Sequence, residues 1–171
     1  WKRYNPKKGT KFYLFCGFKL TKHSHDKFYK DIWELFQRIK ILMSYGCVGY
    51  VMRHEDYRNY ELSNLYIQIA RWCNQQAFYK KMSFWEFVYR NQSYWEEHTL
   101  HITVRPKLKT YEEFKKDCSN GYYGDKDGQI KMCLPLRTVV KTLQQFPEHQ
   151  EELLEMFNYK MTDLINPKLW E

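Results

Sequence analysis

The residues best suited to chemistry lie in the segment 83–106, SFWEFVYRNQSYWEEHTLHITVRP, which holds His98 and the triplet His101-x-Thr103. On a strand, a His-x-Thr triplet can supply a general acid or base together with a hydroxyl that holds a phosphate oxygen. A phosphodiesterase of this kind needs two such triplets on paired strands. No other histidine of the chain has Ser or Thr two residues further on, so the catalytic set is incomplete.

Metal binding needs converging donors, and the histidines supply no standard set. On the strand that we predict at 98–104, His98 and His101 point to opposite faces. Their spacing, taken with the downstream Cys118 and Cys133, matches no zinc motif. His23-Ser-His25 has the His-x-His spacing of rolling-circle nickases, but it lies in the polar run TKHSHDK, where a solvated helix start is expected.

We therefore expect no catalytic residue, no metal and no cofactor. A metal-dependent phosphodiesterase or nickase that uses His101 with another histidine remains the alternative from the enzyme class.

The elements that would position these side chains follow from hydrophobic periodicity. Two capping-box signatures, Ser83-x-x-Glu86 and Thr110-x-x-Glu113, mark helix starts. Strands are predicted at 11–20, 46–52 and 98–104, and helices at 24–42, 62–79, 83–91, 110–118, 136–146 and 153–157. This order predicts an α+β fold. We expect residues 1–171 to form a single helix-rich domain with a small sheet of about three strands.

The charge of the chain is concentrated at one end. Residues 1–60 hold 13 Lys and Arg against five Asp and Glu, so the whole net charge of +8 lies in this basic N-terminal third. Such a field attracts polyanions, and nucleic acid is the partner that we expect, as RNA or single-stranded DNA. The predicted nucleic-acid-binding residues are Lys2, Arg3, Lys7, Lys8, Lys11, Lys22, Lys27, Lys30 and Arg38.

Aromatic residues are interleaved with these cations and make up 19% of the chain. Exposed rings could stack on unpaired bases. The alternative is that the lysines are ordinary surface and that Phe12, Phe15 and Phe18 belong to the core. A second candidate surface is the polar face of the predicted third strand, which would present His101, Thr103, Arg105 and Lys107.

Cysteine usage and hydropathy bear on the compartment. The five cysteines are irregularly spaced and include no CxxC, which favours free thiols in a reducing compartment. No apolar run approaches the ~20 residues that span a bilayer, so we expect no membrane association. The first residue is Trp rather than Met, and we expect the chain to be a piece of a longer protein.

The run FYKKMSFWEFVYRNQSYWEEHTLHI resembles a block in the small nonstructural nuclear proteins of parvoviruses, of the bocaparvovirus type and its relatives. The shared pattern is Phe84-Trp85-x-Phe87, Arg90-Asn91-x-Ser93, then Tyr94-Trp95 followed by two acidic residues and a histidine. The upstream FYLFCGFKL and FYKDIWELFQ echo the strand and helix that precede that block. The chain lacks the Arg/Ser-rich tail and the close cysteine pair of those proteins, so neither a nuclear signal nor a metal site carries over.

The resemblance implies a non-enzymatic nuclear protein that supports viral DNA replication and RNA processing. Together with the charge distribution, it leads us to expect a nucleic-acid-binding accessory protein, nuclear or cytoplasmic in a host cell. A host nuclear protein is a further expected partner. A module that binds an acidic host protein without binding nucleic acid is the alternative from a third class.

Overall fold

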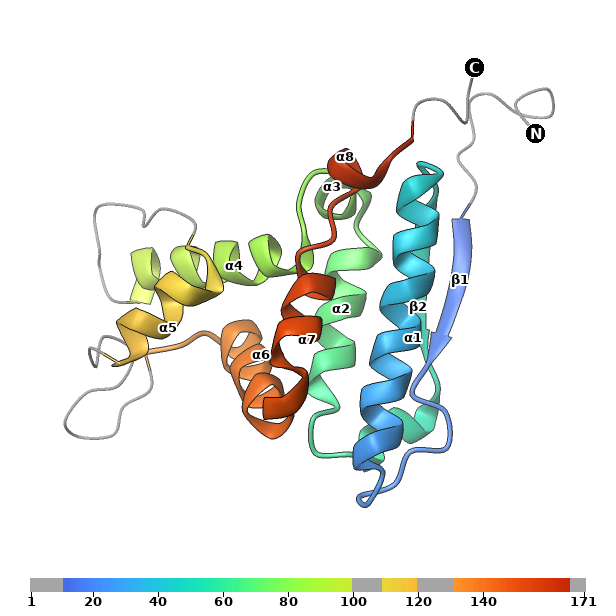
Figure 1. Ribbon diagram of the computed structural model, residues 1–171, viewed down its shortest axis with the longest axis horizontal. Coiled ribbons are helices and arrows are strands. Elements are labelled where there is room, and N and C mark those ends of the chain that lie inside the picture. Colours follow the sequence, from blue (N-terminus) through green and yellow to red (C-terminus); the bar gives the residue numbers. More distant parts are fainter. Residues whose placement is uncertain (1–10, 100–108, 120–130, 167–171) are drawn as a thin grey trace.

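The computed structural model describes residues 11–99, 109–119 and 131–166. Helices make up most of the described chain and pack against a two-stranded parallel sheet, which confirms the predicted helix-rich α+β class. The sheet and α1 lie on one side of the molecule in Figure 1, and α4 and α5 extend from the other. The elements are β1 (Lys11–Cys16), α1 (His25–Ser44), β2 (Val48–Arg53), the 3-10 helix η1 (Glu55–Asn59), α2 (Asn64–Cys73), α3 (Gln76–Tyr79), α4 (Phe84–Thr99), α5 (Tyr111–Ser119), α6 (Leu134–Gln145), the 3-10 helix η2 (Pro147–His149), α7 (Gln150–Phe157) and α8 (Met161–Leu164).

The first three elements form a βαβ unit, in which α1 connects the two parallel strands. The apolar stripe predicted for α1 is buried, with Phe28, Ile32, Leu35 and Ile39 all inaccessible to solvent. β1 is shorter than the predicted strand 11–20. It ends at Cys16 because Gly17 turns the chain with a φ of +76°, a conformation that favours glycine.

The outer edge of β2 is closed by a side chain. The Asn74 amide accepts a hydrogen bond from the Val51 N–H (2.7 Å) and donates one to the Val51 C=O (3.1 Å). This pairing takes place just after α2 and explains why the single helix predicted at 62–79 is divided into α2 and α3. Gln75 between them has extended backbone angles.

Both predicted capping boxes are confirmed. The Glu86 N–H donates to Ser83 Oγ (3.1 Å) and the Ser83 N–H donates to Glu86 Oε2 (2.8 Å), at the start of α4. The same exchange joins Thr110 and Glu113 at the start of α5. Each box satisfies main-chain N–H groups that the first turn of a helix leaves without partners.

The prediction of a third strand at 98–104 is wrong where the structure tests it, because His98 and Thr99 are the last residues of α4. Residues 100–104 lie outside the described part of the chain. Helix α4 continues past the predicted end near Asn91. The prediction ended the helix too early because polar residues occupy its buried positions beyond that point. Gln92 donates to Glu96 (2.8 Å) and to the Lys131 C=O (2.9 Å) and accepts from the Cys133 N–H (2.7 Å). These bonds satisfy a buried amide that hydrophobic periodicity does not detect.

Candidate nucleic-acid interface

The predicted cations that the structure describes all lie in the βαβ unit. Lys11 is in β1, Lys22 is in the loop that follows it, and Lys27, Lys30 and Arg38 are in α1. The four lysines are exposed and Arg38 is half-buried. Lys2, Arg3, Lys7 and Lys8 of the same set lie outside the described residues, as do His101, Thr103, Arg105 and Lys107 of the alternative surface.

These lysines are weakly engaged by acidic groups. Within the described ranges, Lys11 and Lys22 make no ion pair, and Lys30 has a 3.9 Å contact with Glu34 between two well-exposed side chains. An exposed pair of this kind contributes only ~0–1 kcal/mol. The ammonium groups of Lys11, Lys22 and Lys30 are therefore open to an external anion, whereas that of Lys27 donates to the Lys19 C=O.

Arg38 differs from the lysines because it has a structural role. Its Nη2 donates to the Phe15 C=O (3.0 Å) and its Nε donates to the Glu34 C=O (3.2 Å). The guanidinium therefore joins α1 to β1. Among the predicted binding residues, Arg38 is thus partly engaged by the packing of α1 beside β1 (Figure 1).

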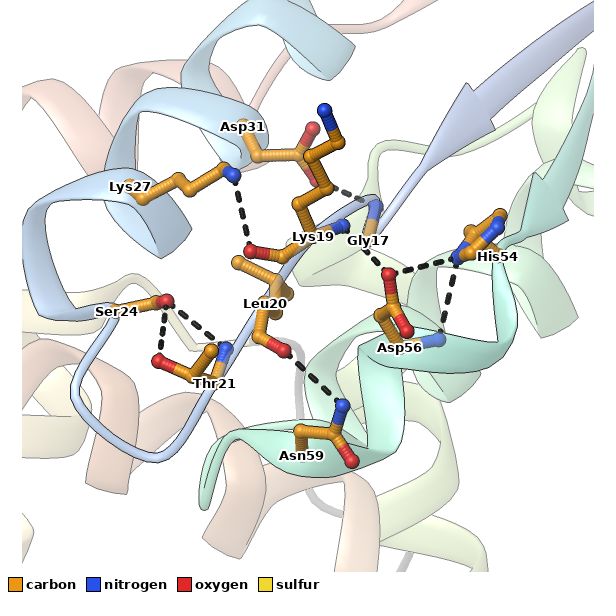
Figure 2. A network of polar contacts seen from close by, with 10 residues as sticks. All are labelled: Gly17, Lys19, Leu20, Thr21, Ser24, Lys27, Asp31, His54, Asp56 and Asn59. Carbon is orange, nitrogen blue, oxygen red and sulfur yellow. Dashed lines mark hydrogen bonds and ion pairs between the residues drawn. The ribbon is translucent and has the colours of Figure 1, made fainter.

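The loop between β1 and α1, residues 17–24, is held by polar contacts at the carboxyl ends of both strands (Figure 2). Asp31 accepts from the Gly17 N–H (2.7 Å), and Asp56 accepts from the Lys19 N–H (2.8 Å). Lys27 Nζ donates to the Lys19 C=O (2.9 Å). The loop is thus fastened to α1 on one side and to η1 on the other.

This arrangement decides what the loop can bind. In a phosphate-binding loop the main-chain N–H groups point at the ligand. Here the N–H groups of Gly17 and Lys19 already donate to carboxylates. These two N–H groups are therefore not free to bind a phosphate, and the exposed cationic side chains of the region are the better candidates for such a contact.

Lys19 is held in a left-handed conformation, with a φ of +53°. A side chain in this region costs about 1–2 kcal/mol, which the hydrogen bonds on both sides of the residue offset. The Lys19 ammonium lies 5.1 Å from the centre of the exposed Phe18 ring. The strained loop thus presents a cation next to an exposed aromatic ring.

The rings of this region are exposed, so the alternative that assigned them to the core is wrong. Phe12, Phe15 and Phe18 retain 43%, 62% and 53% of their accessible surface. Tyr13 and Tyr50 are also exposed, and sequence reasoning did not select either of them as a site residue. The sequence of β1, KFYLFC, could not show that Tyr13 is exposed, because large apolar residues stand at both odd and even positions and so on both faces of the strand.

Two of the candidate catalytic histidines, His25 and His98, make packing contacts, and His101 lies outside the described residues. His25 stacks on Phe146, with ring centroids 4.2 Å apart, and its Nδ1 shares a hydrogen bond with the Tyr60 hydroxyl (2.9 Å). His23 is exposed in the loop. His98 stacks on Tyr94 at the end of α4. In the part of the chain that the structure describes, no group of three or more His, Cys, Asp or Glu side chains is placed to hold a metal ion.

One open cavity of about 340 Å³ brings His98 and Cys133 to the same lining, together with Tyr94 and Arg71. Burial raises the pKa of the Cys133 thiol to about 11. The thiol is therefore neutral near neutral pH and is a poor nucleophile. The cavity does not assemble the metal site that His98 and Cys133 could have suggested.

Among the helices that the structure describes, none has both the length and the apolar composition needed to cross a bilayer. The chain matches no protein-family model, and neither a curated protein nor a solved structure shows significant similarity to it.

Proposed function

We propose that this protein is a non-enzymatic accessory protein that binds nucleic acid through its βαβ unit. The proposal rests on the solvent exposure of Lys11, Lys22 and Lys30 and on how few acidic side chains pair with them. All three are exposed on the basic third of the chain, and only Lys30 has an acidic neighbour among the described residues, at 3.9 Å. Cations in this state can neutralise phosphates and release the counterions of the nucleic acid, which is the main source of sequence-independent affinity.

The resemblance of residues 78–102 to parvovirus small nonstructural nuclear proteins supports a nuclear, viral setting for this binding. In that setting the protein would act in the nucleus of a host cell and assist viral DNA replication and RNA processing. Phe84, Trp85 and Phe87 of the shared pattern are buried in α4, which gives the pattern a role in packing. The binding surface that we propose lies elsewhere, in the βαβ unit.

Salt-dependent fluorescence anisotropy with labelled single-stranded DNA and RNA tests the proposal. The logarithm of the association constant should fall linearly with the logarithm of the salt concentration, with a slope near −0.7 per phosphate contact for single strands. Replacing Lys11, Lys22 and Lys30 together by Ala should flatten the slope by up to about three contacts. The fold should be retained, because exposed lysines contribute little to stability.

A matched control replaces three exposed lysines outside the βαβ unit, Lys80, Lys81 and Lys141, by Ala. This variant removes the same charge and should keep the wild-type slope. Equal flattening in both variants would mean that binding follows net charge alone and would contradict the proposed location. Retention of an acidic protein with no retention of nucleic acid at physiological salt would contradict the function itself.

The enzyme alternative is tested in the same samples. Incubation of the labelled strands with and without Mn²⁺ should leave them intact. Specific cleavage that His101→Ala abolishes would replace the accessory role by a phosphodiesterase or nickase.

A further inference from the structure

The outward face of the β1–β2 sheet carries a cluster of large side chains that no described element covers. Tyr13 pairs with Tyr50 and Phe15 pairs with Met52 in the strand register. Because side chains alternate along a strand, these four residues lie on the same face. We call them the ring face. Tyr13 and Phe15 retain 63% and 62% of their accessible surface, and Tyr50 and Met52 are also exposed.

The opposite face of the sheet is the one that α1 and α2 cover. Leu14 and Val51 are buried there. A Cβ atom added to Gly49 would lie 3.2 Å from Cys73 Sγ of α2 and 3.5 Å from Leu42 Cδ1 of α1. Both helices therefore pack on one side of the sheet, and the ring face is the side on which no described helix packs. Figure 1 shows β1 at the margin of the molecule, beside α1.

Exposed apolar residues are common singly, but a cluster marks an interaction site. Twelve large apolar side chains are exposed in the described residues, and half of them lie in β1, β2 and the loop after β1. Tyr13 and Tyr50 contact edge to face, with centroids 5.8 Å apart and planes at 74°. The Tyr13 and Phe15 rings stand two residues apart on one strand, about 7 Å along it.

The charge around the ring face indicates which class of partner fits it. Neither β1 (KFYLFC) nor β2 (VGYVMR) contains an acidic residue. Lys11 lies on the ring face, with its ammonium 6.0 Å from the centre of the Tyr50 ring. The Arg38 guanidinium donates to the main-chain carbonyl of Phe15, so a second cation contacts β1. A second copy of this chain would place like charges together, whereas a polyanion complements them.

We propose that the ring face is a stacking platform for unpaired bases, so that this protein prefers single-stranded nucleic acid to duplex. The inference rests on the proposed nucleic-acid-binding function and adds the ligand class and the residues that read it. Bases in a duplex are stacked on one another and cannot reach a protein ring, whereas the bases of a single strand can. Lys11, which stands beside the Tyr50 ring, can contact a phosphate of such a strand. An acidic peptide would use the same cations but has no flat π-surfaces to stack on Tyr13 and Phe15.

The test compares a fluorescein-labelled oligothymidine with its duplex with oligoadenosine, by anisotropy at fixed salt. We expect the single strand to bind more tightly. The double variant Tyr13→Leu/Phe15→Leu keeps apolar side chains but removes the rings. It should weaken single-strand binding by roughly 5-fold or more for each stacked base that is lost. The salt slope should not change, because every cation remains.

Two further variants separate stacking from other effects. Tyr13→Phe keeps the ring and should bind like the wild type. Tyr94→Ala removes an exposed ring on α4 and should also leave affinity unchanged. Urea denaturation of each variant checks that the fold is retained, and single-site variants at Tyr50 serve if the double variant is unfolded.

The outcomes distinguish this inference from the function on which it rests. If single strands bind but the double Leu variant binds them equally well, or if duplex binds as tightly as single strand, the ring face is not the platform while nucleic-acid binding stands. If neither nucleic acid binds and poly-glutamate does, both proposals fail.

Discussion

The side-chain amide of Asn74 forms two hydrogen bonds with Val51, one to its N–H and one to its C=O, in the position where a third strand would pair with β2. Val51 is buried, so water cannot readily replace the amide. The sheet is therefore closed on its β2 side by a single residue from the end of α2.

Asn74→Ala should lower the free energy of unfolding by about 1–3 kcal/mol, because it leaves a buried N–H and a buried C=O without these partners. Urea denaturation followed by circular dichroism measures the change. The exposed neighbour Gln75, whose side chain caps nothing, gives the control: Gln75→Ala should change stability by less than about 0.5 kcal/mol. Equal losses in the two variants would show that the Asn74 bonds contribute nothing specific.

Gly17→Ala should destabilise the protein by about 2 kcal/mol or more. The new Cβ would lie 2.5 Å from Cβ and 3.1 Å from Cα of Tyr57, and the residue would keep a φ of +76°. Overpacking and the left-handed conformation both oppose the substitution.

Gly46→Ala isolates the conformational part of that effect. Gly46 has a φ of +63°, but its added Cβ would meet only the flexible end of Ile165, at 3.1 Å. We expect a loss of about 1–2 kcal/mol, measured by the same urea titration. A loss for Gly17→Ala no greater than that for Gly46→Ala would contradict the close approach of Tyr57.

Ser83→Ala should cost about 1 kcal/mol, because the first turn of α4 loses the hydroxyl that accepts from the Glu86 N–H. Glu86 would keep its ion pair with Lys160 at 3.0 Å, so the loss should not exceed the range of a single cap. Ser63 precedes α2 without making any side-chain cap bond. Ser63→Ala should therefore be nearly neutral, and thermal denaturation of the pair of variants checks the contrast.

Burial of Glu96 predicts a pH dependence of stability. Desolvation raises the pKa of its carboxyl above the ordinary range, although the hydrogen bond from Gln92 opposes the change. The folded state therefore binds the proton more tightly than the unfolded state does. The stability that this adds is full below the unfolded pKa and is lost as the pH rises through the folded pKa.

Glu96→Gln should remove that dependence, since the amide stays neutral and can still accept from Gln92. The free energy of unfolding of the wild type should fall relative to Glu96→Gln as the pH rises from acid to neutral, measured by urea titrations across that span. Glu155→Gln, at an exposed position of α7, supplies the control. A difference between wild type and Glu96→Gln that stays constant with pH would refute the burial argument.

Local signals in the sequence were enough to predict α1 and the two capping boxes. The stripe of Phe28, Ile32, Leu35 and Ile39 repeats with the period of a helix, and a capping box is complete within four residues. Features of this kind depend on neighbours in the chain, so they can be predicted without knowledge of the fold.

The extension of α4 and the division of the second predicted helix could not be predicted in this way. Gln92 is buried because it bonds to residues 131 and 133, about 40 positions away. Asn74 ends α2 where it meets Val51, 23 positions earlier. A polar residue with a distant partner breaks the apolar pattern, and sequence reasoning then places a boundary or a loop in the wrong position.

The candidate site likewise has one part that the sequence predicted and one part that it could not predict. Charge is additive along the chain, so the sequence by itself located the basic third and its lysines. It could not determine which face of β1 is covered, because both faces of the strand carry large apolar side chains. Phe12, Leu14 and Cys16 alternate with Tyr13 and Phe15. Only the tertiary structure decided this, by packing α1 and α2 on the side of Leu14 and leaving Tyr13 and Phe15 exposed.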